Sequence, residues 1–155
     1  FWSKMNSTLR NERDILLFKE NLKPSFKPKR QKHFAYGDKR ANTLLCRLRV
    51  GRSLLKSHSF SINMSSTDRC LCGKIDTIQS YFLTCFLFQN ERNDLFNKIN
   101  QILPKFKQQT KSEQCDILLY GINRDNILPD PRNRIITLAV QNYITKTNRF
   151  SKHYD

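Results

Sequence analysis

The chain has 155 residues, the length of one ordinary domain or of one domain with a basic extension. Its 28 Lys and Arg against 13 Asp and Glu give a formal net charge of +15. Its 38% apolar residues suit a modest core, which excludes a large two-layer enzyme, and no stretch of about 18 apolar residues predicts a membrane span. The opening Phe1-Trp2-Ser3-Lys4 lacks an initiator Met and a signal-peptide pattern, which predicts a fragment whose true start lies upstream.

The positive charge is concentrated in the first third of the chain. Residues 1–56 hold 15 Lys and Arg against four acids, whereas residues 57–155 hold 13 against nine. A concentrated positive field favours a polyanion, because each phosphate contact releases condensed counterions. A basic, solvated surface that only keeps the protein soluble is the alternative.

The first predicted elements are a helix over residues 7–21 and an extended connector over residues 23–33. Two prolines and five Lys and Arg within the connector's eleven residues disfavour regular structure. Aromatic side chains among these cations can stack on unpaired bases, or they can anchor the connector on the core. These aromatic residues are Phe26, Phe34 and Tyr36.

Residues 39–57 predict a second helix with Leu44, Leu45, Leu48 and Leu55 on one face. The cations of this helix fall mainly off the leucine face, so they would contact either a polyanion or solvent. Gly51 lowers the helix propensity of the segment. The connector and this helix together supply the residues that we predict to bind nucleic acid, which are Lys27, Lys29, Arg30, Lys32, Lys39, Arg40, Arg47, Arg49, Arg52 and Lys56.

Three more helices are predicted toward the carboxyl end. A helix over residues 88–103 stops at Pro104, with Leu95, Phe96, Ile99 and Leu103 inward. A short helix is capped by Ser112 and closed by Gly121. The last helix runs from about Arg132 to Phe150, with Ile135, Leu138, Ala139 and Tyr143 inward.

These elements predict a mostly α fold, because no run of alternating strand residues is present. We expect a small helical domain with a Cys-rich, zinc-knuckle-like turn and a basic N-terminal arm. Residues 1–38 would form the helix and basic connector, residues 39–104 the Cys-rich helical region, and residues 105–155 a helical tail on the same core.

The most informative segment holds Cys70, Cys72 and Cys85. A Cys-x-Cys followed by Gly73 is typical of a turn that presents two thiolates to one metal ion, and a following helix, which Asp76 can cap, would carry another. Zinc with this spacing would be structural. The alternative is three reduced, partly buried thiols. An odd number of cysteines and no sign of secretion disfavour a disulfide framework and fit an intracellular location, in the nucleus or the cytoplasm.

This segment resembles the zinc-binding region at the carboxyl end of non-LTR retrotransposon reverse transcriptases. That family reads Cys, one to three residues, Cys, seven or eight residues, His, four residues, Cys. Gly73, Asp76-Thr77 and Tyr81-Phe82-Leu83 match its accompanying residues, as do the leucine-arginine stretch at 48–58 and Arg92 downstream. The resemblance covers roughly residues 44–96.

The chain departs from the family at the histidine position, which is Ser80 here. Three explanations stay open. His58 supplies the fourth ligand beside Cys70, Cys72 and Cys85; or water completes a weaker site; or this copy has lost its zinc.

The resemblance implies a region that binds template RNA or target DNA while the polymerase copies. On physical grounds we expect the cations to contact phosphates and Tyr81 or Phe86 to stack on a base. The chain has no Asp-Asp pair, no phosphate loop and no hydrolase motif, so we expect no enzyme activity and no small-molecule substrate. Its expected partners are RNA or DNA and the rest of the parent reverse transcriptase. The alternatives are a structural or protein-interaction module, or a decayed transposon copy.

Overall fold

The computed structural model describes residues 36–122 and 130–151. The chain divides into two units, Phe1–Gln31 and Lys32–Asp155, and all described residues belong to the second. The predicted helix over residues 7–21 and the connector over residues 23–33, with Lys27, Lys29, Arg30 and Lys32, lie outside the described residues. The described residues are mostly helical and include no strand, which confirms the predicted fold class.

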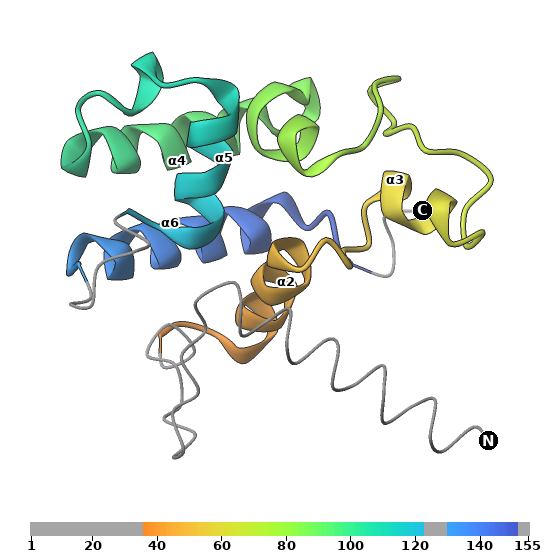
Figure 1. The fold of residues 1–155 in the computed structure, drawn as a ribbon, viewed down its shortest axis with the longest axis horizontal. Helices are drawn as coiled ribbons and strands as arrows, with labels where there is room; N and C mark the ends of the chain where they lie inside the picture. Colours follow the sequence, from red (N-terminus) through yellow and green to blue (C-terminus); the bar gives the residue numbers. More distant parts are fainter. Residues whose placement is uncertain (1–35, 123–129, 152–155) are drawn as a thin grey trace, which may run out of the picture. The chain divides into compact units, whose positions relative to one another are not determined.

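The last helix, α6 (Arg132–Thr147), contacts α2 (Lys39–Arg49), α4 (Gln89–Ile102) and α5 (Lys111–Tyr120) (Figure 1). One apolar core joins these helices, so the described parts of the predicted segments 39–104 and 105–155 share it. No helix in the described ranges is both long enough and apolar enough to cross a bilayer.

The apolar face of α6 differs from the prediction by a small rotation. Ala139 and Tyr143 are buried as expected, but Ile135 and Leu138 are 48% and 38% exposed. Because three helices pack on α6, its buried surface is wider than a single stripe and includes three further aliphatic residues: Ile136, Val140 and Ile144.

The predicted helix over residues 39–57 is two helices, α2 and the short α3 (Lys56–Ser61). Gly51 separates them with φ at +69°, a left-handed conformation that favours glycine. Asp38 caps α2 by accepting a hydrogen bond from the Ala41 amide at 3.0 Å. Leu55 lies beyond the break but is still buried in the core.

The ends of α4 and α5 follow local chemistry. Helix α4 stops at Ile102, before Pro104, as predicted. Helix α5 is capped by Thr110, two residues earlier than the predicted Ser112, because Thr110 and Glu113 form a capping box. Gly121, with φ at +83°, closes α5 as predicted.

Candidate metal centre

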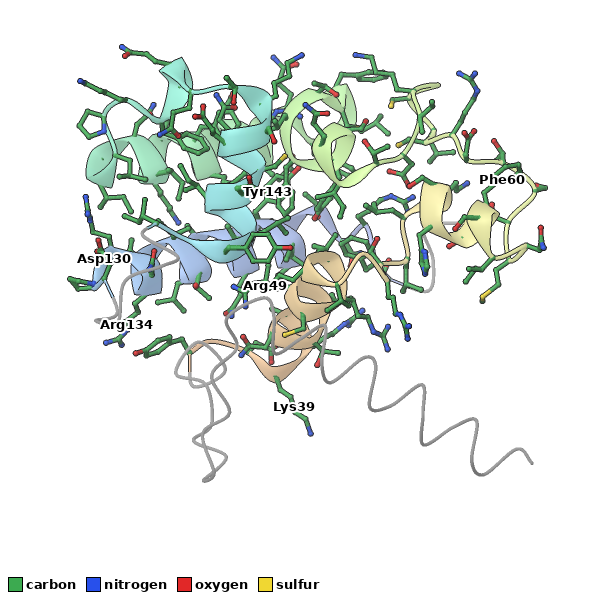
Figure 2. The ribbon with its side chains drawn as sticks, viewed as in Figure 1. Lys39, Arg49, Phe60, Asp130, Arg134 and Tyr143 are labelled. Atoms are coloured by element: carbon green, nitrogen blue, oxygen red, sulfur yellow. The ribbon has the colours of Figure 1, made fainter. Side chains whose placement is uncertain are left out.

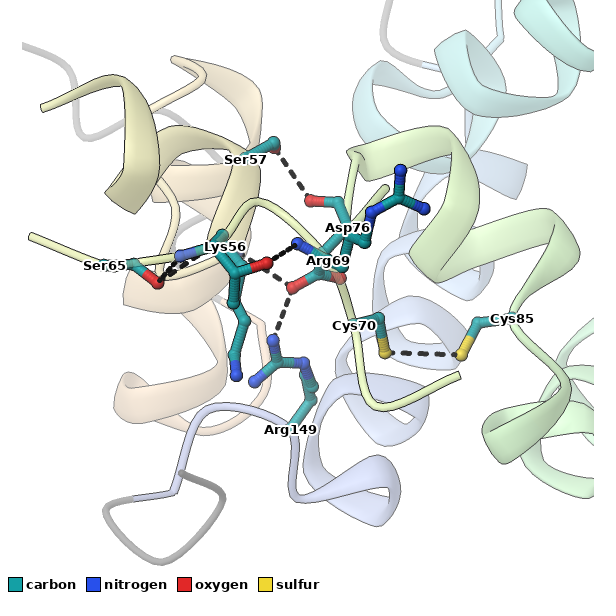
Figure 3. A network of polar contacts seen from close by, with 9 residues as sticks. Lys56, Ser57, Ser65, Arg69, Cys70, Asp76, Cys85 and Arg149 are labelled. Atoms are coloured by element: carbon teal, nitrogen blue, oxygen red, sulfur yellow. Dashed lines mark hydrogen bonds and ion pairs between the residues drawn. The ribbon is translucent and has the colours of Figure 1, made fainter. Parts of the chain in front are cut away.

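Three cysteine side chains converge on one point. The Sγ atoms of Cys70, Cys72 and Cys85 all lie within 4.8 Å of one another, and those of Cys70 and Cys85 are 3.8 Å apart. Figure 3 shows the sulfur atoms of Cys70 and Cys85 pointing toward each other. All three are free thiols. The sequence prediction that they form one cluster is therefore confirmed.

A tight turn presents the first two thiols. The Gly73 amide donates to the Cys70 carbonyl and the Cys70 amide donates to the Lys74 carbonyl, both at 2.8 Å. The Arg69 guanidinium also donates to the Gly73 carbonyl at 2.9 Å. Gly73 has φ at +80° with no neighbouring atom within 4 Å of an added Cβ, so the turn needs glycine for its backbone and not for space.

The third thiol stands at the end of a π-helical turn, Ser80–Thr84. The Cys85 amide donates to the Ser80 carbonyl at 2.8 Å. The guanidinium of Arg92, which is buried in α4, donates to the Cys85 carbonyl at 2.6 Å. The arginine that follows the last cysteine in the resemblance thus fixes the backbone of that cysteine.

Backbone amides donate to all three sulfurs, and each amide lies two residues further along the chain. They belong to Cys72, Lys74 and Leu87, and they donate to Cys70, Cys72 and Cys85 respectively. Such hydrogen bonds stabilise a thiolate more than a thiol.

Burial and hydrogen bonding have opposite effects on the pKa values of the three thiols. Burial raises the pKa of Cys70, and it raises the pKa of Cys85 to about 12. Burial also acts on Cys72, but hydrogen bonds from the Lys74 amide and the two neighbouring thiols bring the pKa of Cys72 below its ordinary value. Thiolates at Cys70 and Cys85 therefore need a compensating positive charge, which a bound cation would supply.

The geometry suits a soft metal ion. A tetrahedral centre with Zn–S bonds of about 2.3 Å has S···S edges of about 3.8 Å, which matches the 3.8 Å between Cys70 and Cys85. A disulfide would need a separation of about 2.05 Å. Three sulfur donors can hold zinc, and they also suit monovalent copper.

Two sequence expectations around the cluster differ from the structure. His58 lies on α3, half-buried, and is not a member of the cluster formed by the described residues. Asp76 does not cap the following turn; Thr77 does, by accepting a hydrogen bond from the Ser80 amide at 3.1 Å. Ser80 itself is buried.

Asp76 instead anchors the segment of residues 65–78, which we call the cysteine loop. Its carboxylate is buried, pairs with Arg149 and accepts a hydrogen bond from the Lys56 amide at 2.9 Å, while its carbonyl accepts one from the Ser57 hydroxyl at 2.8 Å (Figure 3). The pair joins the loop to α3 and to the segment after α6. The sequence carried no local signal for it, because Asp76 and Arg149 are 73 positions apart.

The predicted nucleic-acid-binding side chains that the structure describes differ in how far they are exposed to solvent. Four of the described ones are exposed and Lys56 is partly exposed; the exposed residues are Lys39, Arg40, Arg47 and Arg52. Figure 2 shows Lys39 projecting away from the ribbon.

Arg49 has a packing role that the sequence did not reveal. Its Nε donates to the Leu119 carbonyl of α5, its own carbonyl accepts a hydrogen bond from the Tyr120 hydroxyl at 2.8 Å, and burial lowers its pKa. It therefore joins α2 to α5.

The aromatic residues predicted to contact bases also differ in their exposure to solvent. Tyr81 is fully buried, and its hydroxyl is hydrogen-bonded to the Thr147 hydroxyl at 2.8 Å, so the prediction that it stacks on a base is wrong. Phe86 is 60% exposed and stays a candidate. Tyr36 has the Arg134 guanidinium 5.0 Å above its ring, which anchors it to α6.

The chain was compared with protein-family models, curated proteins and solved structures, and none of them matches it. The cysteine geometry and the exposed cations therefore carry the functional argument.

Proposed function

We propose that this chain is a zinc-stabilised, nucleic-acid-binding region from the carboxyl-terminal part of a non-LTR retrotransposon reverse transcriptase. It would assist the binding of template RNA or target DNA and contribute no catalytic residue of its own. It would act inside the cell, in the nucleus or the cytoplasm, with the rest of the parent polymerase as its second partner.

The convergence of Cys70, Cys72 and Cys85 is the observation that carries this proposal. The resemblance depends on their spacing, and sulfur atoms brought within 4.8 Å of one another are what a metal-stabilised turn requires. Zinc is the proposed metal because three sulfur donors and a chain with a modest core suit a structural zinc site.

The exposed cations support the nucleic-acid part of the proposal. Lys39, Arg40, Arg47 and Arg52 lie on α2 or just after it and are exposed, in a chain whose net charge is +15. Contacts of this kind position a phosphate backbone without reading bases, so binding should depend strongly on salt and weakly on sequence.

Titration of the zinc-loaded full chain with a labelled RNA or DNA duplex at two salt concentrations tests this proposal. Arg47→Glu with Arg52→Glu should weaken binding and flatten its salt dependence. Lys105→Glu with Lys107→Glu is the matched control, because it makes the same charge change at exposed residues between α4 and α5. Equal losses in the two double variants would mean nonspecific polycation binding and would reject the proposed surface.

A structural or protein-interaction module is the second candidate, because apolar side chains are exposed on α3 and just after it. Phe60 and Ile62 are each 49% exposed and Met64 is 74% exposed. This candidate predicts no nucleic-acid affinity above that of a generic polycation.

A decayed copy without metal is favoured only by Ser80 at the family's histidine position, and stoichiometric zinc in the purified protein would exclude it.

A further inference from the structure

An open cavity of about 330 Å³ lies where the cysteine loop, the π-helical turn and the start of α5 meet. Its lining includes Lys74 from the loop, Thr84 from the turn and Lys111, the first residue of α5. Helix α5 contacts this turn. Small-molecule sites in proteins typically measure about 300–1,000 Å³, so a cavity of this size admits a group as large as one nucleotide.

The charges around the cavity have one sign. No aspartate or glutamate is among the described residues that line it, whereas both lysines are exposed and neither forms an ion pair with another described residue. The acidic residues nearest to the lysines in the sequence are already engaged. Asp76 pairs with Arg149, and the Glu113 carboxylate accepts hydrogen bonds from the amide and the hydroxyl of Thr110. The cavity therefore favours an anion, and the positive amino end of α5 adds to this preference.

Hydroxyl groups provide hydrogen-bond donors beside the two cations. The Thr77 hydroxyl accepts a hydrogen bond from the Ser80 amide at 3.1 Å, so its own proton can be donated to a ligand oxygen. Ser80 belongs to the same lining and is 7% exposed, and its hydroxyl has no hydrogen-bond partner among the described residues. A phosphate oxygen is an acceptor of the kind that such a hydroxyl lacks.

We propose that this cavity binds a phosphate monoester, whose charge is neutralised by Lys74 and Lys111. Ile75, which lines the cavity and is 49% exposed, contacts the organic part of the ligand. A monoester carries about −1.5 to −2 charges at pH 7, which two lysines match, whereas an internal phosphate of a nucleic acid carries only about −1. The ligand is therefore the phosphorylated end of a strand or a free nucleotide. This inference goes beyond the proposed function, because it does not involve the cations of α2.

Calorimetric titration of the full chain with two pairs of ligands tests the inference. One pair is adenosine monophosphate and adenosine; the other is a single-stranded oligonucleotide with phosphates at both ends and the same strand with hydroxyls at both ends. We expect the phosphorylated member to bind at least about tenfold more tightly, because charge-assisted hydrogen bonds to phosphate are stronger than neutral ones. A preference within the first pair identifies a free nucleotide as the ligand, and a preference confined to the second pair identifies a strand end.

Two double variants locate the preference. Lys74→Gln with Lys111→Gln should abolish it while circular dichroism shows an unchanged helical content. Lys105→Gln with Lys107→Gln makes the same charge change at exposed residues that do not line the cavity, and it should preserve the preference.

The outcomes separate this inference from the proposed function. Equal affinities within both pairs, or a preference that survives the loss of Lys74 and Lys111, would overturn the cavity as a monoester site. Inorganic phosphate that binds as tightly as adenosine monophosphate would also overturn it, because the organic part would then make no contact. Arg47→Glu with Arg52→Glu should weaken binding of both strands and leave the ratio of their affinities unchanged, so a failure of the α2 surface is distinguishable from a failure of the cavity.

Discussion

The cysteine loop and the helix pair α4–α6 are ordered by different interactions. Along residues 65–78 only Cys70 and Asp76 are buried, one a thiol and the other a carboxylate. Between α4 and α6, by contrast, the buried side chains are mainly aliphatic and aromatic, as with Ile99, Val140 and Tyr143. Figure 2 shows Tyr143 in the middle of the helical part.

The difference shows where each region gets its stability. Apolar burial stabilises the helix pair without help from a ligand, at roughly 25 cal/mol per Å² of surface removed from water. The loop has no apolar core of its own, so it depends on a buried ion pair, on backbone hydrogen bonds and, in our proposal, on a metal ion. The following predictions test this contrast, beginning with the largest expected effect.

Loss of the Asp76 carboxylate should be the most damaging single change. Asp76→Ala breaks a buried ion pair by removing one of its two members, which typically costs about 4 kcal/mol in the free energy of unfolding. Urea denaturation measures the loss. Asp94→Ala removes a carboxylate from an exposed pair with Lys146 and should cost less than about 1 kcal/mol. Similar losses for the two variants would contradict the role of Asp76 as an anchor.

Truncation in the helix pair should be nearly as costly and independent of metal. Ile99→Ala empties a fully buried site in α4 and should lower the free energy of unfolding by about 3 kcal/mol, with or without chelator. Lys98→Ala, at the exposed neighbouring position, serves as the control. A loss that appears only in the presence of chelator would mean that the two regions are not independent.

Metal removal should affect the loop more than the helices. In the zinc-loaded protein, a chelator should speed amide hydrogen exchange in residues 68–76 by at least about tenfold, roughly 1.4 kcal/mol, because the loop loses its main link to Cys85. Exchange in α6 should change little. Equal acceleration in both regions would show that the loop and the helices unfold as one unit.

The smallest effect is expected at the start of α5. Thr110→Ala removes the capping hydroxyl and should cost about 1 kcal/mol at neutral pH, whereas Thr110→Ser should retain most of the stability. Hydrogen bonds from the Thr110 amide and hydroxyl lower the pKa of Glu113 below its ordinary 4.5. The contribution of Glu113 is therefore present above that pH and is lost as the pH falls further. Urea denaturation of the wild type and of Thr110→Ala, at neutral pH and again well below pH 4.5, tests this. If the stability lost in Thr110→Ala is as large in acid as at neutral pH, the capping box is excluded.

Much of the helical architecture could be predicted because its signals are local. Pro104 ends α4, Gly121 closes α5, and the Cys-x-Cys-Gly pattern at residues 70–73 predicted the turn that presents two thiols. The break at Gly51 was only partly foreseen. Glycine reduces helix propensity, but only the fold shows that residue 51 adopts a left-handed conformation.

The errors concern residues whose surroundings come from distant parts of the chain. Arg49 looked like a surface cation, yet it bonds to a carbonyl 70 positions away. Tyr81 looked available for stacking on a base, yet four aromatic rings lie within 5.6 Å of its own, centroid to centroid. The structure leaves Phe86 as the exposed aromatic residue of that prediction.

The sequence by itself determined that this protein is helical, strongly basic and equipped with three cysteines at a spacing suited to one metal ion. Those properties depend on composition and short-range periodicity, which act within a few residues. Only the tertiary structure decided which cations face solvent, that Asp76 pairs with Arg149, and that the Ser80 hydroxyl is enclosed with no hydrogen-bond partner among the residues that the structure describes. Burial and pairing of this kind depend on which distant segments pack together, and no local pattern encodes that choice.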